Sequence, residues 1–149
     1  MDPIDRRICD QLQQDCRQSM MELGERVGLS ASACHRRIKA LEEAGVISGY
    51  VATLNPNKLG QTMSFVLEVS LNSQSDEAMK AFEQTVASIP QILEASLMTG
   101  ASDFVLRINA SDSNEFEAIH AEVRRAPFVS RLETKMVLRT VKPWSGIRV

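Results

Sequence analysis

The sequence has few residues that could hold a structural metal or form disulfides: three cysteines and two histidines in 149 residues. An odd number of cysteines cannot pair completely, and none belongs to a Cys-x-x-Cys pair accompanied by a second pair or by two histidines at zinc spacing. We therefore predict no metal site, and we expect Cys9, Cys16 and Cys34 to be small buried thiols. A redox role for Cys16 stays open as an alternative, although no neighbouring residue marks this thiol as activated.

Long apolar stretches are also missing. The longest uncharged run, from Ala44 to Asn57, is shorter than the ~20 apolar residues that a membrane-spanning helix needs. The N-terminus lacks the pattern of a signal peptide, since Asp2 follows the first methionine. These features predict a cytoplasmic protein without membrane contact.

Signatures of catalysis are absent as well. The sequence contains no nucleophile–base set, phosphate-binding loop or metal cluster, so we expect no catalytic residue, no cofactor and no enzyme activity. The net charge of −2 argues against a protein that coats nucleic acid by bulk attraction alone. Any binding to DNA must therefore depend on a local arrangement of cations.

The stretch from Met20 to Leu41 has the pattern of two short helices joined by a tight turn. Ser19 and Glu22 form a capping box at the start of the first helix. Gly28 lies where a helix end needs left-handed dihedral angles, and Ser30 can cap the second helix. A break this short predicts a helix-turn-helix. An earlier helix starting at Asp2-Pro3 would complete a three-helix unit, whose predicted core is Ile4, Ile8, Leu12, Leu23, Val27, Ile38 and Leu41.

The second of these helices carries a local cluster of positive charge. From Arg26 to Leu41 there is no Asp or Glu, and the basic residues favour phosphate contact on one face of the helix. We expect Ser32 and Arg36 to meet base edges, whereas Ser30, His35, Arg37 and Lys39 would mainly hold phosphates. The full predicted DNA-binding set is Ser30, Ser32, Ala33, His35, Arg36, Arg37 and Lys39. The alternative for this face is an ordinary solvated helix surface.

The rest of the chain predicts a second domain with alternating strands and helices. In order, the pattern gives a strand over 63–71, a helix from Ser75 to Pro90, strands over 92–98 and 104–110, a helix from 111–113 to Pro127, and a last strand in which Leu132, Thr134, Met136 and Leu138 alternate. The order β-α-β-β-α-β matches a ferredoxin-like sandwich. The predicted fold class is α+β: an N-terminal three-helix winged or helix-turn-helix domain over 1–45, an extended linker arm over 46–60, and a ferredoxin-like βαββαβ sandwich over 61–149.

Several motifs in combination resemble one family, the Lrp/AsnC or feast/famine transcriptional regulators of bacteria and archaea. The resemblance covers nearly the whole chain and is carried by Asp5-Arg6-Arg7-Ile8, Gly28-Leu29-Ser30, Arg36-Arg37-Ile38, the run 41–47, Leu54-Asn55-Pro56, Leu59-Gly60 and the run 99–104. It implies a homodimer that assembles into tetramers or octamers, binds double-stranded DNA, and takes a small effector, usually an amino acid, in its C-terminal domain.

By the same resemblance, the turn between the strands over 92–98 and 104–110 corresponds to the family's effector loop. The implied effector-binding residues are Thr99, Gly100, Ala101, Ser102 and Asp103, with Thr134 and Met136 of the last strand as weaker candidates. Gly100 lets a ligand approach the backbone, Ser102 offers a hydroxyl, and Asp103 could pair with an ammonium group. The alternative is a plain hairpin turn in which Asp103 only bonds nearby N–H groups.

Together these patterns predict a sequence-specific DNA-binding transcriptional regulator whose output depends on an amino acid or related metabolite bound at an oligomer interface. The alternative function is an architectural protein that binds DNA independently of any effector.

Overall fold

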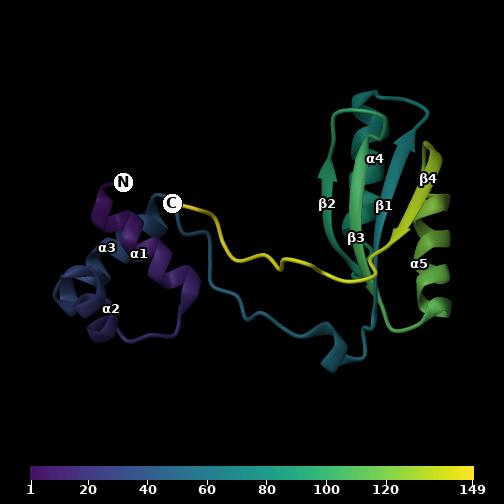
Figure 1. Cartoon of the computed structure of the whole chain (residues 1–149). Helices are drawn as coiled ribbons and strands as arrows, with labels where there is room; N and C mark the ends of the chain where they lie inside the picture. The colour runs from purple at the N-terminus through teal and green to yellow at the C-terminus, as the bar shows by residue number, and fades with distance from the viewer. The chain divides into compact units, whose positions relative to one another are not determined.

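The computed structural model describes all 149 residues, which form two compact units. One unit consists of Met1–Thr53 together with Val141–Val149, and the other consists of Leu54–Thr140 (Figure 1). The sequence places the C-terminal tail in the second domain, but Val141–Val149 packs with the first. No helix in the structure has the length and apolar character required to cross a membrane.

The first unit is a helix-turn-helix without a wing. It contains α1 (Pro3–Gln14), α2 (Met20–Val27) and α3 (Ala31–Glu43), and none of its residues lies in a strand. The predicted capping box is formed: the Ser19 N–H donates to Glu22 Oε2 over 2.7 Å, and the Glu22 N–H donates to Ser19 Oγ over 3.2 Å. Gly28 ends α2 with φ +77°, as the turn requires.

Close contact between α2 and the following turn depends on Gly24. The N–H of Leu29 donates to the Gly24 carbonyl over 2.9 Å, and a Cβ atom at Gly24 would lie only 2.5 Å from the Leu29 carbonyl oxygen. The backbone therefore approaches the helix where a side chain would prevent it.

The core of the first unit agrees with the predicted apolar stripes. Five of the seven predicted residues are buried, and Ile4 and Leu12 pack against them while partly exposed. Cys9 and Cys34 are buried as expected. The prediction of a buried thiol is wrong for Cys16, which is exposed because it lies in the loop after the end of α1.

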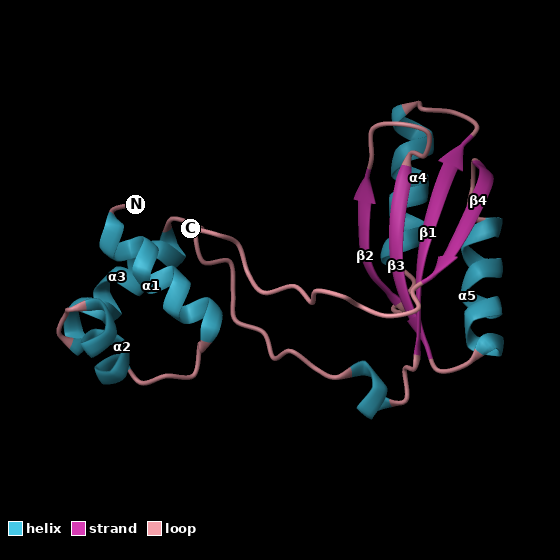
Figure 2. Ribbon diagram, in the orientation of Figure 1, coloured by secondary structure: helices cyan, strands magenta, loops and turns pink.

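The second unit has the predicted ferredoxin-like element order. Its elements are β1 (Met63–Leu71), α4 (Asp76–Ala87), β2 (Ile92–Leu97), β3 (Phe104–Ala110), α5 (Ser113–Arg125) and β4 (Val129–Met136). The strands form one sheet in the order β2-β3-β1-β4, with all neighbours antiparallel (Figure 2). A short 3-10 helix, η1 (Pro56–Leu59), precedes the sheet.

Alternate residues of β1 hold the helices against the sheet. Phe65, Leu67, Val69 and Leu71 are buried, while the residues between them are only half-buried. On the helices, Ala78 and Phe82 of α4 and Ile119 and Val123 of α5 join the same apolar cluster. Because β1 lies second from one edge of the sheet, its buried face contributes residues to the centre of the core.

The predicted alternation along the last strand is only partly present. Leu132 is half-buried and packs against the core, but Thr134 and Met136 are exposed, and Leu138 lies beyond the end of β4. The reason is the position of β4 at the edge of the sheet, where no further strand covers it within the chain.

Candidate functional site

The outer face of α3 presents most of the predicted DNA-binding residues to solvent. Exposed are Ser30, Ser32, His35, Arg36 and Lys39, whereas Ala33 and Arg37 are half-buried. The Ser30 hydroxyl is already used locally, because it accepts the Ala33 N–H over 3.3 Å and lies 3.2 Å from the Ser32 hydroxyl. Ser30 therefore acts first as the N-terminal cap of α3.

Two cations on this face remain available to an anion. Arg36 makes no hydrogen bond or ion pair in the structure. Lys39 lies 3.8 Å from Glu43 one turn further along α3, and both side chains are about two-thirds exposed. Exposed pairs of this kind contribute little stability, so the Lys39 ammonium can exchange its partner for a phosphate.

Arg37 differs from its neighbours because two carboxylates of the same unit bond one nitrogen, Nη1, of its guanidinium. Nη1 donates to Asp2 Oδ2 and to Asp5 Oδ1, each over 2.7 Å, and the side chain is 29% exposed. The hydrogen bonds to Asp2 and Asp5 raise the pKa of Arg37. The pKa of Asp2 is lowered, first by the hydrogen bond from the Asp5 backbone and then by the one from Arg37. Nη1 therefore has no N–H left for another partner, whereas Nε and Nη2 make no hydrogen bond in the structure. The phosphate contact of Arg37 stays a prediction.

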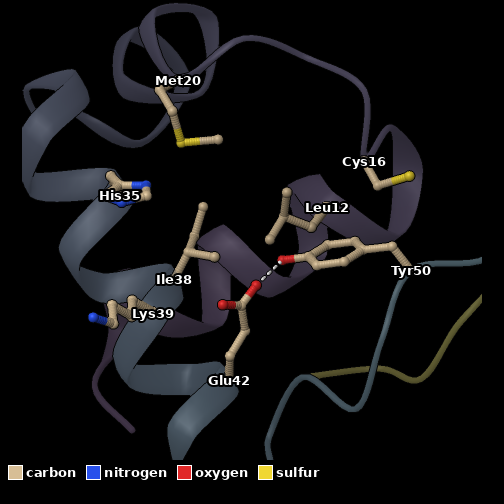
Figure 3. A pocket seen from close by; sticks show the side chains of 8 residues that line it. All are labelled: Leu12, Cys16, Met20, His35, Ile38, Lys39, Glu42 and Tyr50. Atoms are coloured by element: carbon tan, nitrogen blue, oxygen red, sulfur yellow. Dashed lines mark hydrogen bonds between the residues drawn. The ribbon is translucent and has the colours of Figure 1, made fainter.

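A groove of about 520 Å³ lies beside α3 in the first unit (Figure 3). Its lining consists of Leu12, Cys16, Met20, His35, Ile38, Lys39, Glu42 and Tyr50. Figure 3 shows the Tyr50 hydroxyl directed at the Glu42 carboxylate, to which it donates a hydrogen bond over 2.9 Å. Partial burial and this carboxylate raise the pKa of Tyr50 to about 12. The sequence assigns Tyr50 only to an extended arm, and its contact with α3 was not predicted.

No metal centre is formed by the side chains of the chain. No three His, Cys, Asp or Glu side chains lie together in a way that could hold an ion.

The Gly100 turn is fixed to the end of β1 by Asp103. The carboxylate accepts the Leu71 N–H over 2.7 Å and the Gln74 side-chain amide over 2.9 Å, and the Asp103 N–H donates to the Val69 carbonyl over 2.9 Å. These are the contacts of the plain hairpin alternative, in which Asp103 shapes the turn. Gly100 has φ +121°, a conformation that other residues rarely adopt.

The remaining predicted effector residues do not form one cluster within a single chain. Thr99, Gly100 and Ala101 are exposed in the turn, and Ser102 is half-buried. On β4, Thr134 pairs with Leu67 and Met136 with Phe65, in the middle of β1 and towards its start. The Gly100 turn is tied to the other end of β1, so the structure does not bring Thr134 and Met136 to it.

A helix-turn-helix with a cationic outer helix, followed by a ferredoxin-like unit, defines a two-part DNA-binding regulator. The chain belongs to the Lrp/AsnC family of transcriptional regulators. The AsnC-type helix-turn-helix domain matches residues 1–42, and the Lrp/AsnC ligand binding domain matches residues 64–147.

Individual relatives agree with this assignment. The chain is 41% identical over 143 residues to the leucine-responsive regulatory protein of Rhizobium meliloti (strain 1021), covering 95% of this chain and 92% of the relative. It is 34% identical, with the same coverage, to the proline dehydrogenase transcriptional activator of Rhizobium radiobacter. A transcriptional regulator of Neisseria meningitidis solved as an L-Met complex superimposes with a TM-score of 0.93 at 30% identity, covering 99% of this chain and 96% of that one.

Proposed function

We propose that this regulator binds specific DNA sites as a dimer through α3 and that an amino acid, or a closely related metabolite, bound to its second unit changes this binding. The DNA-binding part of the proposal rests on the exposure of Arg36 and Lys39 and on the absence of a strong partner for either cation. Both are exposed on a helix face without a carboxylate between Arg26 and Leu41, and Arg36 has no partner within the chain.

The contacts divide by side-chain chemistry. Arg36 can bond a guanine edge with two N–H groups, and the Ser32 hydroxyl is short enough to reach a neighbouring base. His35 and Lys39 hold phosphates, with Ser30 at the helix start, and Ala33 packs beside them. Two copies of α3 related by a two-fold axis engage half-sites about one helical turn, ~34 Å, apart.

The proposal also gives each part of the chain a role. Residues 1–45 bind DNA, 46–60 link the units, and the chain from 61 onward binds the effector and forms oligomers, with Val141–Val149 returning to the first unit. The location is the cytoplasm, where the DNA lies, and the protein has no enzyme activity or cofactor.

The effector site requires more than one copy of the chain. The turn 99–103 supplies backbone groups and the Ser102 hydroxyl, while Asp103 holds its shape. Thr134 and Met136 lie away from this turn within a chain, so they complete the site only from a neighbouring subunit in a tetramer or octamer. The L-Met complex of the Neisseria relative supports an amino acid as the ligand class.

One experiment tests both parts of the proposal. DNA duplexes are first selected from a random-sequence library by the full-length protein, and binding to the recovered duplex is measured with each of the twenty amino acids. We expect at least one amino acid to change the affinity and the sedimentation of the protein. Occupancy that is indifferent to all twenty would instead favour an effector-independent architectural protein. Failure to enrich any sequence would contradict specific DNA binding.

A further inference from the structure

Three side chains join the start of α1 to the outer flank of α3. Asp2 Oδ1 caps α1 by accepting the N–H groups of Ile4 and Asp5, each over 2.8 Å, and Asp5 Oδ2 accepts the Asp2 N–H over 3.0 Å. The second oxygen of each carboxylate is bonded to Arg37. Each acid therefore contributes one oxygen to the capping box and the other to α3.

We propose that Arg37 is a positioning residue for DNA recognition, which sets the rotation of α3 through Asp2 and Asp5 and makes no phosphate contact itself. The inference rests on α3 being the helix that meets DNA. We name the cluster of Asp2, Asp5 and Arg37 the α1–α3 clamp. The proposal gives this clamp a role in the specificity of DNA binding.

The charge of the clamp disfavours a phosphate. Two carboxylates and one guanidinium carry a net charge of −1, and Nη1 is already bonded to both acids over 2.7 Å. Both N–H groups of Nη1 are used in this way, so a phosphate could bond only Nε or Nη2 and would lie beside two carboxylates that repel it. Arg36, one residue earlier, has no such competitor and faces solvent.

The location of the clamp allows it to control the direction of the DNA-facing side chains. Cys34, Ile38 and Leu41 fix α3 on its buried side, but apolar contacts tolerate small rotations better than a directional hydrogen bond does. Since side-chain tips lie roughly 5–6 Å from a helix axis, a rotation of about 20° moves them by about 2 Å. A displacement of this size is enough to break a paired hydrogen bond from Arg36 to a base.

The test compares binding of the full-length protein to the library-selected duplex and to a scrambled duplex over a range of salt concentrations. We expect Arg37→Gln to lower the preference for the selected duplex by about fivefold or more, the equivalent of one base contact. The slope of log affinity against log salt should remain that of the wild type. A slope reduced by about 0.9 would identify Arg37 as a phosphate contact and overturn the proposal.

Asp5→Asn gives the sharper comparison, because a DNA contact by Arg37 and a positioning role of Arg37 predict opposite results. If Arg37 contacted DNA, removing a nearby negative charge would free the guanidinium and tighten binding. A positioning role predicts a lower preference for the selected duplex, and tighter binding to it would overturn the proposal. Asparagine keeps an oxygen for the Asp2 N–H, so this variant supplies the answer if Arg37→Gln fails to fold. Circular dichroism shows whether each of the two variants is folded.

A charge exchange and a matched control complete the design. The double variant Asp5→Arg with Arg37→Asp rebuilds the ion pair with the cation on α1. It should recover preference for the selected duplex relative to Arg37→Asp alone, and no recovery would count against a positioning role.

Arg36→Gln is the control on the same helix and should change preference for the selected duplex. If Arg36→Gln leaves both preference and slope unchanged, α3 is not the DNA-reading helix and the proposed function fails, whatever Arg37 does.

Discussion

The side chain of Gln13 and the backbone of Ile147 form a pair of hydrogen bonds that connects α1 to the C-terminal tail. Gln13 Nε2 donates to the Ile147 carbonyl over 2.9 Å, and the Ile147 N–H donates to Gln13 Oε1 over 2.6 Å. Two residues further on, Val149 packs against the apolar core of the first unit. The tail is therefore part of the DNA-binding unit, although it follows the last strand of the effector-binding unit.

Removing this contact should destabilise the DNA-binding unit. We expect Gln13→Ala to lower its free energy of unfolding by about 1 kcal/mol, since two exposed hydrogen bonds are lost. Deleting residues 141–149 should cost about 1–3 kcal/mol, because the packing of Val149 is lost as well. Denaturant unfolding followed by circular dichroism measures both. Gln14→Ala is the matched control, because the neighbouring Gln14 makes no side-chain hydrogen bond and should leave stability unchanged.

Gly24 should not accept a side chain, although it lies inside a helix. Replacing glycine by alanine in a helix normally stabilises by about 1 kcal/mol. At Gly24 the added Cβ would lie 2.5 Å from the Leu29 carbonyl oxygen, which belongs to the backbone of the helix-turn-helix turn. We expect Gly24→Ala to lower stability by about 1–3 kcal/mol and to weaken DNA binding with it. Met21→Ala, at an exposed position of the same helix, is the control and should be close to neutral.

Local patterns made most of the fold predictable from the sequence. Capping residues, glycine turns and apolar spacing act over a few residues, so they predicted the boundaries of the helices and the buried residues of β1. The exposure of Met136 was not predictable in this way. It depends on β4 being an edge strand, and the order of strands in the sheet is a property of the whole unit.

The candidate sites show the same division between local and distant contacts. Charge segregation along one helix predicted Arg36 and Lys39 as DNA contacts, and the structure leaves both side chains exposed. The ion pairs of Arg37 were not predicted, because Asp2, one of its partners, lies 35 residues away and Asp5 is itself part of a local cap. The contact of Gln13 with Ile147 spans 134 residues and has no counterpart in any sequence pattern.

The ionisation of Tyr50 offers a direct measurement of the contact between the arm and α3. The chain contains a single tyrosine, so ultraviolet titration of the phenolate observes this group alone. We expect a pKa of about 12 instead of the ordinary 10, because partial burial and the Glu42 carboxylate both disfavour the phenolate. The raised pKa means that this contact stabilises the folded protein below about pH 10 and that the contribution is lost as the pH rises towards 12.

Glu42→Gln is the variant that isolates the carboxylate. It should bring the pKa of Tyr50 part of the way back towards 10, with the remaining shift due to burial. Glu43→Gln, which changes an adjacent carboxylate without a bond to Tyr50, is the control. A Tyr50 pKa near 10 in the wild-type protein would show that the hydroxyl does not rest against Glu42 in solution.

Arg36 and Lys39 should affect DNA binding in different ways. Arg36→Ala should relax the preference at one base position, at a cost of about 1–3 kcal/mol for the preferred base. Lys39→Ala should weaken binding to all sequences about equally and reduce the salt slope by about 1. Binding to a set of duplexes that differ at single positions separates the two effects. An unchanged base preference in Arg36→Ala would remove Arg36 from the base-contacting residues.

Asp103 should stabilise the effector-binding unit even when no effector is present. Its carboxylate accepts hydrogen bonds from the Leu71 N–H and from Gln74, and bonds to a charged acceptor contribute about 1.5–3 kcal/mol each. Asp103→Asn keeps an acceptor for Leu71 but loses the charge, so we expect a lower melting temperature without any amino acid. Ser102→Ala removes a side chain that makes no hydrogen bond, and should leave this melting temperature unchanged. The opposite result for Asp103→Asn, normal stability with loss of the thermal shift caused by amino acids, would make Asp103 a partner of the ligand ammonium group instead of a support for the turn.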